Sequence, residues 1–269
     1  MQKEKYDDSK VTKNLEKIKH KLLVLSGKGG VGKSTVSTNL AVALSEKGYK
    51  VGILDIDIHG PSIPKMLSLE DKKPEGSNLG ISPILYSDNL KVMSMAFLIK
   101  DKDSPVIWRG PMKMAAIKQL IGDVDWGNLD YLIVDIPPGT GDEPLSIIQL
   151  ISDCDGALVV TTPQDVALVS VRKSVSFVKK MNIPVIGIIE NMSGFKCPHC
   201  NKTINIFKTG GGLKTSNDFN VPLLGTIPLD ENIVLSGDDG KPIVKTNIDS
   251  DSSKSFLKIV ENIEKILKK

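Results

Sequence analysis

The sequence has little cysteine, little net charge and no long apolar run. Three cysteines in 269 residues are too few for a disulfide framework, which favours a reducing compartment such as the cytoplasm. No apolar run approaches the length of a membrane span, and the amino-terminal segment is polar rather than signal-like. The net charge of +3 is too small to indicate nucleic-acid binding. We therefore expect a cytoplasmic protein that binds neither a membrane nor nucleic acid.

Short apolar runs alternate along the chain with segments of helical periodicity. Strands are expected at residues 22–25, 51–55, 90–95, 131–134, 156–161, 184–190 and 221–228, and helices at 113–121, 143–151, 166–180 and 255–267. This alternation predicts an α/β fold, doubly wound, with a mostly parallel sheet and helices on both faces. Residues 1–20 are lysine-rich and are expected to form a polar extension, followed by a single domain over 21–269.

A glycine-rich loop follows the first strand and opens the next helix. Gly27, four further residues, Gly32, Lys33 and Ser34 have the spacing of a phosphate-binding loop. Glycine lets the backbone aim successive N–H groups at an anion, and the helix that follows adds the positive end of its dipole. Lys33 would neutralise the β- and γ-phosphates, and the Ser34 hydroxyl would ligate Mg²⁺. The candidate ATP contacts of this loop are Gly27, Lys28, Gly29, Gly30, Val31, Gly32, Lys33, Ser34 and Thr35.

Carboxylates follow two of the predicted strands. Asp55 and Asp57 lie at the carboxyl end of the second strand, where open α/β sheets bind their ligands. Asp135 ends a further apolar strand, the arrangement of a Walker B carboxylate that holds the water shell of a metal ion. The alternative for Asp57 is a turn or helix cap, because Gly60 and Pro61 follow.

Cys197 and Cys200 form the motif CPHC, for which three interpretations remain open. A redox motif of this kind would open a helix early in a thioredoxin-like fold, whereas CPHC follows a late strand. Structural zinc needs four ligands, and His199 lies too close to the two cysteines to complete a closed site easily. Two cysteines from each of two chains would supply four thiolates, enough for a [4Fe–4S] cluster on a two-fold axis.

Several longer motifs resemble the Mrp/ApbC-type iron–sulfur cluster carriers of the MinD/ParA superfamily of P-loop ATPases. They are KGGVGKS at 28–34, HGPS at 59–62, VIWRGPM at 106–112, WGNLDYLIVDIPPGTGD at 126–142 and the CxxC of CPHC. Within VIWRGPM, Trp108 is a candidate core or interface anchor, and Arg109 is a candidate contact for phosphate or a partner.

The resemblance implies roles for individual residues. Lys28 would reach across a homodimer interface to the partner's nucleotide, so that Lys28, Lys33 and Asp57 form the catalytic set. Asp57 would orient the attacking water and, with Ser34 and Asp135, lie around Mg²⁺. Asn191 would hydrogen-bond the adenine, and the backbone near Pro228 would cover its other face.

The resemblance also implies a function, to which one alternative remains. It implies a slow ATP hydrolase that holds a [4Fe–4S] cluster on Cys197 and Cys200 of two chains and hands it to apo-proteins. The alternative is a MinD/ParA-like positioning ATPase with structural zinc at CPHC. MinD-like proteins end in a membrane-binding helix, but the apolar face expected over residues 255–267 favours packing on the core.

Overall fold

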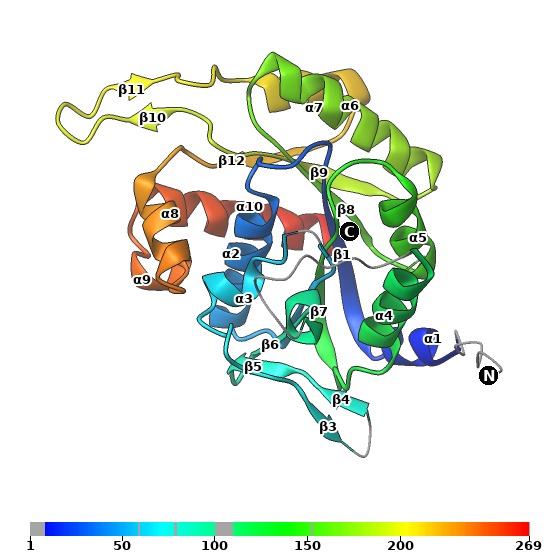
Figure 1. The fold of residues 1–269 in the computed structure, drawn as a ribbon. Coiled ribbons are helices and arrows are strands. Elements are labelled where there is room, and N and C mark those ends of the chain that lie inside the picture. Colours follow the sequence, from blue (N-terminus) through cyan, green and yellow to red (C-terminus); the bar gives the residue numbers. More distant parts are fainter. Residues whose placement is uncertain (1–8, 59, 78–79, 100–109, 152, 269) are drawn as a thin grey trace.

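The computed structural model describes residues 9–58, 60–77, 80–99, 110–151 and 153–268. Trp108 and Arg109 therefore lie outside the described residues. Figure 1 shows one central sheet with helices on both sides. Across the sheet the strands are β12 (Leu223–Thr226), β9 (Val185–Glu190), β8 (Gly156–Thr161), β1 (Ile18–Ser26), β7 (Leu129–Asp135), β2 (Val51–Asp55), β6 (Leu90–Ser94) and β5 (Ile84–Ser87). Only β5 runs antiparallel to its neighbour, so the predicted doubly wound, mostly parallel α/β fold is confirmed.

Alternate residues of each strand face opposite layers of helices. Leu22 and Val24 belong to one buried cluster and Leu23 and Leu25 to another, as a period of two requires. The first layer comprises α2 (Lys33–Glu46), α3 (Ile63–Met66), α8 (Glu231–Asp238), α9 (Ile243–Thr246) and α10 (Asp251–Leu267). The second comprises α1 (Ser9–Leu15), α4 (Gly110–Gly122), α5 (Asp142–Leu150), α6 (Asp165–Lys180) and α7 (Gly211–Phe219).

Shorter elements complete the described fold. They are a 3-10 helix η1 (Met95–Leu98), the strand pair β3 (Glu75–Ser77) and β4 (Gly80–Ser82), and the strand pair β10 (Phe195–Lys196) and β11 (Thr203–Ile204). In Figure 1 the β10–β11 hairpin extends away from the central sheet. No helix among the described residues is long and apolar enough to cross a bilayer.

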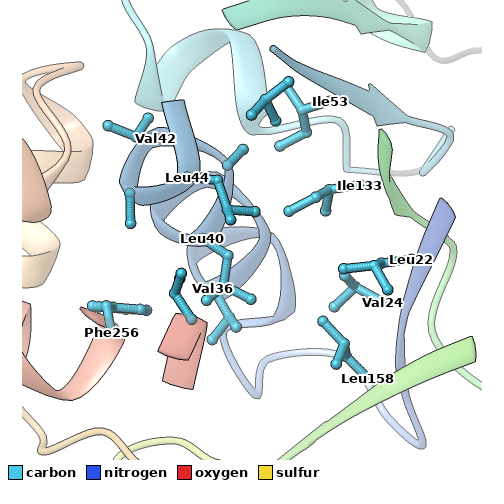
Figure 2. Close-up of a cluster of buried hydrophobic side chains, with 14 of the residues drawn as sticks. Leu22, Val24, Val36, Leu40, Val42, Leu44, Ile53, Ile133, Leu158 and Phe256 are labelled. Atoms are coloured by element: carbon cyan, nitrogen blue, oxygen red, sulfur yellow. The ribbon is translucent and has the colours of Figure 1, made fainter. Parts of the chain in front are cut away.

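Helix α2, which follows the glycine-rich loop, lies at the centre of the first layer. Figure 2 shows Val36, Leu40 and Leu44 of α2 between strand side chains and Phe256 of α10. Phe256 and Ile259 are fully buried, so the apolar face of the carboxyl-terminal helix packs on the core as predicted. That burial occupies the face through which the helix would otherwise contact a membrane.

The structure differs from the expectation of a polar extension over residues 1–20. Residues 9–15 form α1, which packs on α4, and β1 already begins at Ile18. Val11, Leu15 and Ile18 are each less than 5% exposed and belong to the second core cluster. Their spacing places them on one side of the segment, and the charged residues between them face solvent. Residues 9–20 are thus part of the folded domain.

The parallel strands bring their carboxyl ends to one edge of the sheet. The glycine-rich loop follows β1, Asp55 ends β2, Asp135 ends β7 and Glu190 ends β9. Asp55 and Asp135 are direct register partners on neighbouring strands. This edge is where an open α/β sheet forms its ligand site.

Candidate nucleotide site and cysteine hairpin

The loop between β1 and α2 has the backbone of a phosphate-binding loop. Gly30 and Gly32 adopt φ of 79° and 78°, in the left-handed region that side chains disfavour. At Gly27 the constraint is space rather than φ, because an added Cβ would lie 2.4 Å from the carbonyl carbon and oxygen of Ser170 in α6. Glycine is therefore needed here both for the turn of the loop and for its close packing against α6.

Asp135 is the centre of a hydrogen-bond network beneath this loop. The carboxylate is fully buried, and its Oδ2 accepts hydrogen bonds from Lys33 Nζ and from Ser34 Oγ, each at 2.6 Å. Its Oδ1 accepts a hydrogen bond from Ser37 Oγ at 2.6 Å. Asp57 Oδ2 lies 4.0 Å from Lys33 Nζ. The lysine and the hydroxyl expected to bind phosphate and Mg²⁺ thus both contact Asp135, the carboxylate expected in the Walker B position.

Asp55 lies deeper than Asp57 on the same edge. Its Oδ2 accepts a hydrogen bond from Ser94 Oγ at 3.0 Å, and its Oδ1 accepts one from the Asp57 N–H at 3.2 Å. Burial, and next the negative charge of Asp135, raise the pKa of Asp55 to about 8, although the Lys33 ammonium opposes the shift. Two carboxylates two residues apart therefore differ in environment, with Asp57 nearer the loop and Asp55 in the protein interior.

Two adjoining cavities lie over this edge of the sheet. The first, of about 230 Å³, is lined by Ser26, Gly29, Gly30, Gly32, Lys33, Ser34, Thr35, Asp57, Gly60, Ser62 and Pro138. The second, of about 290 Å³, is lined by Gly32, Thr35, Ser62, Lys65, Met66, Asn191, Met192, Pro228, Leu229, Asp230, Ile233, Val234, Gly237 and Asp238. We call them the phosphate cavity and the base cavity. They share Gly32, Thr35 and Ser62, so one elongated ligand could occupy both.

The base cavity brings together the two residues expected at the adenine. Asn191 follows β9 and Pro228 follows β12, and both line this cavity. The Asn191 amide also donates a hydrogen bond to the Val31 carbonyl at 2.9 Å, which ties the cavity wall to the phosphate-binding loop. Of the expected loop contacts, Gly27, Lys28 and Val31 line neither cavity.

Sequence reasoning missed the far wall of the base cavity. Helix α8 supplies part of that wall, and no helix was expected over residues 231–238. The available signal was Asp230, whose carboxylate accepts a hydrogen bond from the Asn232 N–H at 2.9 Å and caps the helix. Helix α8 is short and none of its residues is fully buried, so its sequence has no strong apolar periodicity.

Lys28 lies in the loop but does not take part in the Asp135 network. Its carbonyl accepts a hydrogen bond from Ser26 Oγ at 3.0 Å, which shapes the start of the loop. Within the described ranges, its ammonium has no carboxylate within 4.0 Å in the same chain, and the neighbouring Gly29 and Gly30 are exposed. Lys28 itself is partly exposed and precedes Gly29, which lines the phosphate cavity.

Cys197 and Cys200 lie in the loop between β10 and β11. The β10–β11 hairpin projects away from the central sheet (Figure 1). The hairpin is closed by the Cys197 N–H, which donates to the Lys202 carbonyl at 3.0 Å. The backbone N–H groups of His199 and Cys200, followed by the Cys200 thiol, lower the pKa of Cys197. A lowered pKa favours the thiolate, the form that binds metals.

The hairpin geometry bears on the three interpretations of CPHC. The motif lies between two short strands and does not open a helix, unlike the redox motif. Among the described residues no three or more His, Cys, Asp or Glu side chains cluster in a metal-binding arrangement. A single chain therefore offers two thiols here, and a four-ligand site requires ligands from elsewhere.

Comparisons with known proteins show which family the chain resembles along most of its length. The model of the NUBPL iron-transfer P-loop NTPase family (ParA) matches residues 17–264. The iron-sulfur cluster carrier protein of Methanocaldococcus jannaschii is 54% identical over 256 residues, which cover 95% of this chain and 88% of that protein.

Two solved structures share the fold. The nucleotide-binding protein of Archaeoglobus fulgidus in complex with ADP is 36% identical, with a TM-score of 0.80 over 94% of this chain and 98% of that one. The cell division ATPase MinD of Pyrococcus furiosus is 26% identical, with a TM-score of 0.68 over 92% and 99%.

Proposed function

The chain belongs to the NUBPL iron-transfer P-loop NTPase family, and from that premise we propose that it is an ATP-dependent iron–sulfur cluster carrier. Two copies hold a [4Fe–4S] cluster between them and transfer it to apo-proteins, which are its partners. The observation that carries this proposal is the pair of accessible thiols on a projecting hairpin that follows Asn191 of the base cavity along the chain. The relative from Methanocaldococcus jannaschii is named an iron-sulfur cluster carrier protein, which supports the same function.

The nucleotide is Mg-ATP, bound along the two adjoining cavities. The phosphates lie against the loop N–H groups and Lys33, and the adenine lies between Asn191 and the backbone at Pro228. Mg²⁺ fits the oxygen donors of Ser34, Asp57 and Asp135, and when bound it supplies charge neutralisation at the phosphates. Binding requires Lys33 and Ser34 to exchange contacts with Asp135 for contacts with the ligand.

Hydrolysis depends on groups at the rim of the phosphate cavity. Asp57 lines this cavity and orients the attacking water, while Lys33 neutralises charge on the phosphates. Lys28 completes the catalytic set from the partner chain, so the site is whole only in the homodimer. We expect slow turnover for this reason, and we expect ATP binding and dimerisation to strengthen each other.

The cluster is the cargo and is held by Cys197 and Cys200 of both chains. The lowered pKa of Cys197 favours the thiolate and so supports ligation by sulfur. Ile204 and Ile206, on and after β11, are 49% and 55% exposed, an apolar surface that pairing of two hairpins would cover. We place this function in the cytoplasm, where reduced thiols persist.

Anaerobic reconstitution with iron and sulfide tests the proposal. The wild-type protein should acquire a visible absorption band and about four irons per dimer, as a [4Fe–4S] cluster requires. Cys197→Ala and Cys200→Ala should lose both signals. The matched control is Cys154→Ala, because Cys154 is the third cysteine and is held half-buried at a distance from the hairpin, where burial raises its pKa to about 11.

Two outcomes would contradict the proposal. One is a colourless protein that retains stoichiometric zinc, the result expected of a positioning ATPase with structural zinc. The other is a chain that sediments as a monomer with Mg-ATP bound, because four thiolates then never meet. Sedimentation of Lys28→Ala separates ATP binding from dimerisation, because this variant should still bind ATP as a monomer but should dimerise poorly.

A further inference from the structure

Glu190 is a buried carboxylate that the nucleotide chemistry described above does not use. It is the last residue of β9 and is 1% exposed. Its Oε1 accepts hydrogen bonds from Ser193 Oγ at 2.5 Å and from the Gly210 N–H at 3.2 Å. Its Oε2 accepts one from the Gly212 N–H at 2.5 Å. Burying a carboxylate away from water among three neutral donors costs free energy. We therefore expect its hydrogen bonds to fix a specific arrangement of the segments that supply the donors.

The three donors come from the two ends of one segment. Ser193 precedes β10, whereas Gly210 and Gly212 lie at the start of α7, after β11. Between these ends lies the whole hairpin with Cys197 and Cys200. A single side chain therefore joins the stem by which the chain enters the hairpin to the stem by which it leaves.

The entering stem is also part of the base cavity. The Ser193 N–H donates to the Ile227 carbonyl at 2.8 Å, and the Leu229 N–H donates to the Gly194 carbonyl at 2.8 Å. Leu229 lines the base cavity, as does Asn191, the residue next to Glu190. The wall that contacts the nucleotide base and the stem of the hairpin are thus one hydrogen-bonded unit.

The leaving stem is held by charge and by close packing. The N–H groups at the start of α7 carry the positive end of the helix dipole, which favours a carboxylate at this place. An added Cβ on Gly212 would lie 3.0 Å from Glu190 Cβ and 3.1 Å from its Oε2. Because no space separates α7 from this side chain, a shift of the stem must move Glu190 as well.

We propose that Glu190 is a positioning residue that fixes the cysteine hairpin relative to the base cavity. It makes the position of Cys197 and Cys200 follow the nucleotide state, because the same short segment lines the cavity and carries the hairpin. The inference rests on the proposed function only in treating these thiols as metal ligands. The connection that Glu190 makes between the two stems of the hairpin depends only on the hydrogen bonds described above.

Glu190→Gln is the test substitution, because it preserves shape, removes the charge and replaces one acceptor oxygen with a donor. Ser216→Ala is the matched control. Ser216 Oγ makes a buried hydrogen bond to the Val221 carbonyl at 2.6 Å, at the opposite end of α7. This control loosens the same helix and leaves the hairpin stems intact.

Three measurements on the reduced 269-residue chain separate positioning from stability. Hydrogen exchange of residues 193–210 reports the hairpin. Titration with Co²⁺ alone reports the thiolate site through its visible absorption. Titration with a fluorescent ADP analogue reports the nucleotide site. In Glu190→Gln we expect exchange to be faster and Co²⁺ binding to be weaker, each by about tenfold or more, since charge-assisted hydrogen bonds are lost. ADP affinity should change by less than about threefold.

The inference is overturned if Glu190→Gln exchanges and binds Co²⁺ like the wild type, or if Ser216→Ala shows the same losses. Should Glu190→Gln fail to fold, Ser193→Ala removes only one donor and must give the same directions of change to sustain the inference. If Co²⁺ binds wild type and Cys197→Ala alike, the proposed metal function fails. Hydrogen exchange then still decides the role of Glu190.

Discussion

Replacing Asp55 by asparagine should remove a specific pH dependence of folding. The pKa of this fully buried carboxyl is about 8 in the folded protein, raised by burial and by the charge of Asp135. In an unfolded chain an aspartate has a pKa of about 3.9. Between these values the folded protein holds a proton that the unfolded chain has released. Asp55 therefore lowers the free energy of unfolding as pH rises, by about 1.4 kcal/mol per pH unit.

The asparagine variant should gain stability relative to the wild type as pH rises. Its amide oxygen can still accept the hydrogen bond from the Asp57 N–H, and its NH2 group can donate to Ser94 Oγ in place of the bond that Asp55 accepts there, but the side chain does not titrate. Between pH 5 and pH 7.5 the difference in the free energy of unfolding should grow by roughly 3 kcal/mol in favour of Asp55→Asn. Urea denaturation at several pH values, with chelator and reductant present, measures this difference.

A charge-matched control is available on the neighbouring strand. Asp130 accepts a hydrogen bond from the Lys50 N–H at 2.8 Å near the opposite end of the sheet, where water reaches it. Asp130→Asn removes the same formal charge outside the buried Asp55–Asp135 pair, so it shows what the loss of one charge alone does to stability. Parallel pH profiles of wild type and Asp55→Asn would refute the reasoning, because they would mean that Asp55 is already ionised in the folded protein.

Three further substitutions, one of them with a matched control, test other contacts. Lys33→Met leaves the Asp135 carboxylate buried without its cation, and should abolish ATP binding and lower the free energy of unfolding by about 3–5 kcal/mol in urea denaturation. Gly27→Ala should lower it by about 1–3 kcal/mol, because the new Cβ would lie 2.4 Å from the α6 backbone, whereas Gly29→Ala, with open space around it, should be neutral in thermal denaturation. Asn191→Ala loses its bond to the loop carbonyl and should weaken binding of a fluorescent ADP analogue by roughly tenfold, and unchanged affinity would contradict its place in the base cavity.

The parallel strands of the central sheet, the phosphate-binding loop and the CPHC pair could be predicted because each is encoded within a few neighbouring residues, whereas the antiparallel edge strand β5 was not predicted. The φ values at Gly30 and Gly32 and the apolar runs of the sheet follow from local backbone preference and burial. Strand order places Asp55 beside Asp135. The rule that open parallel sheets bind ligands at the carboxyl ends of their strands had already predicted that both carboxylates lie at one edge.

Tertiary structure alone decided the remainder. The place of residues 9–15 in the core depends on α4, and the far wall of the base cavity is supplied by helix α8. The raised pKa of Asp55 arises from burial and from the charge of Asp135 on another strand. The connection of the two hairpin stems through Glu190 arises from hydrogen-bond donors on other segments. Local periodicity carries no information about these contacts, because the free energy of each one depends on which distant segments exclude water from it.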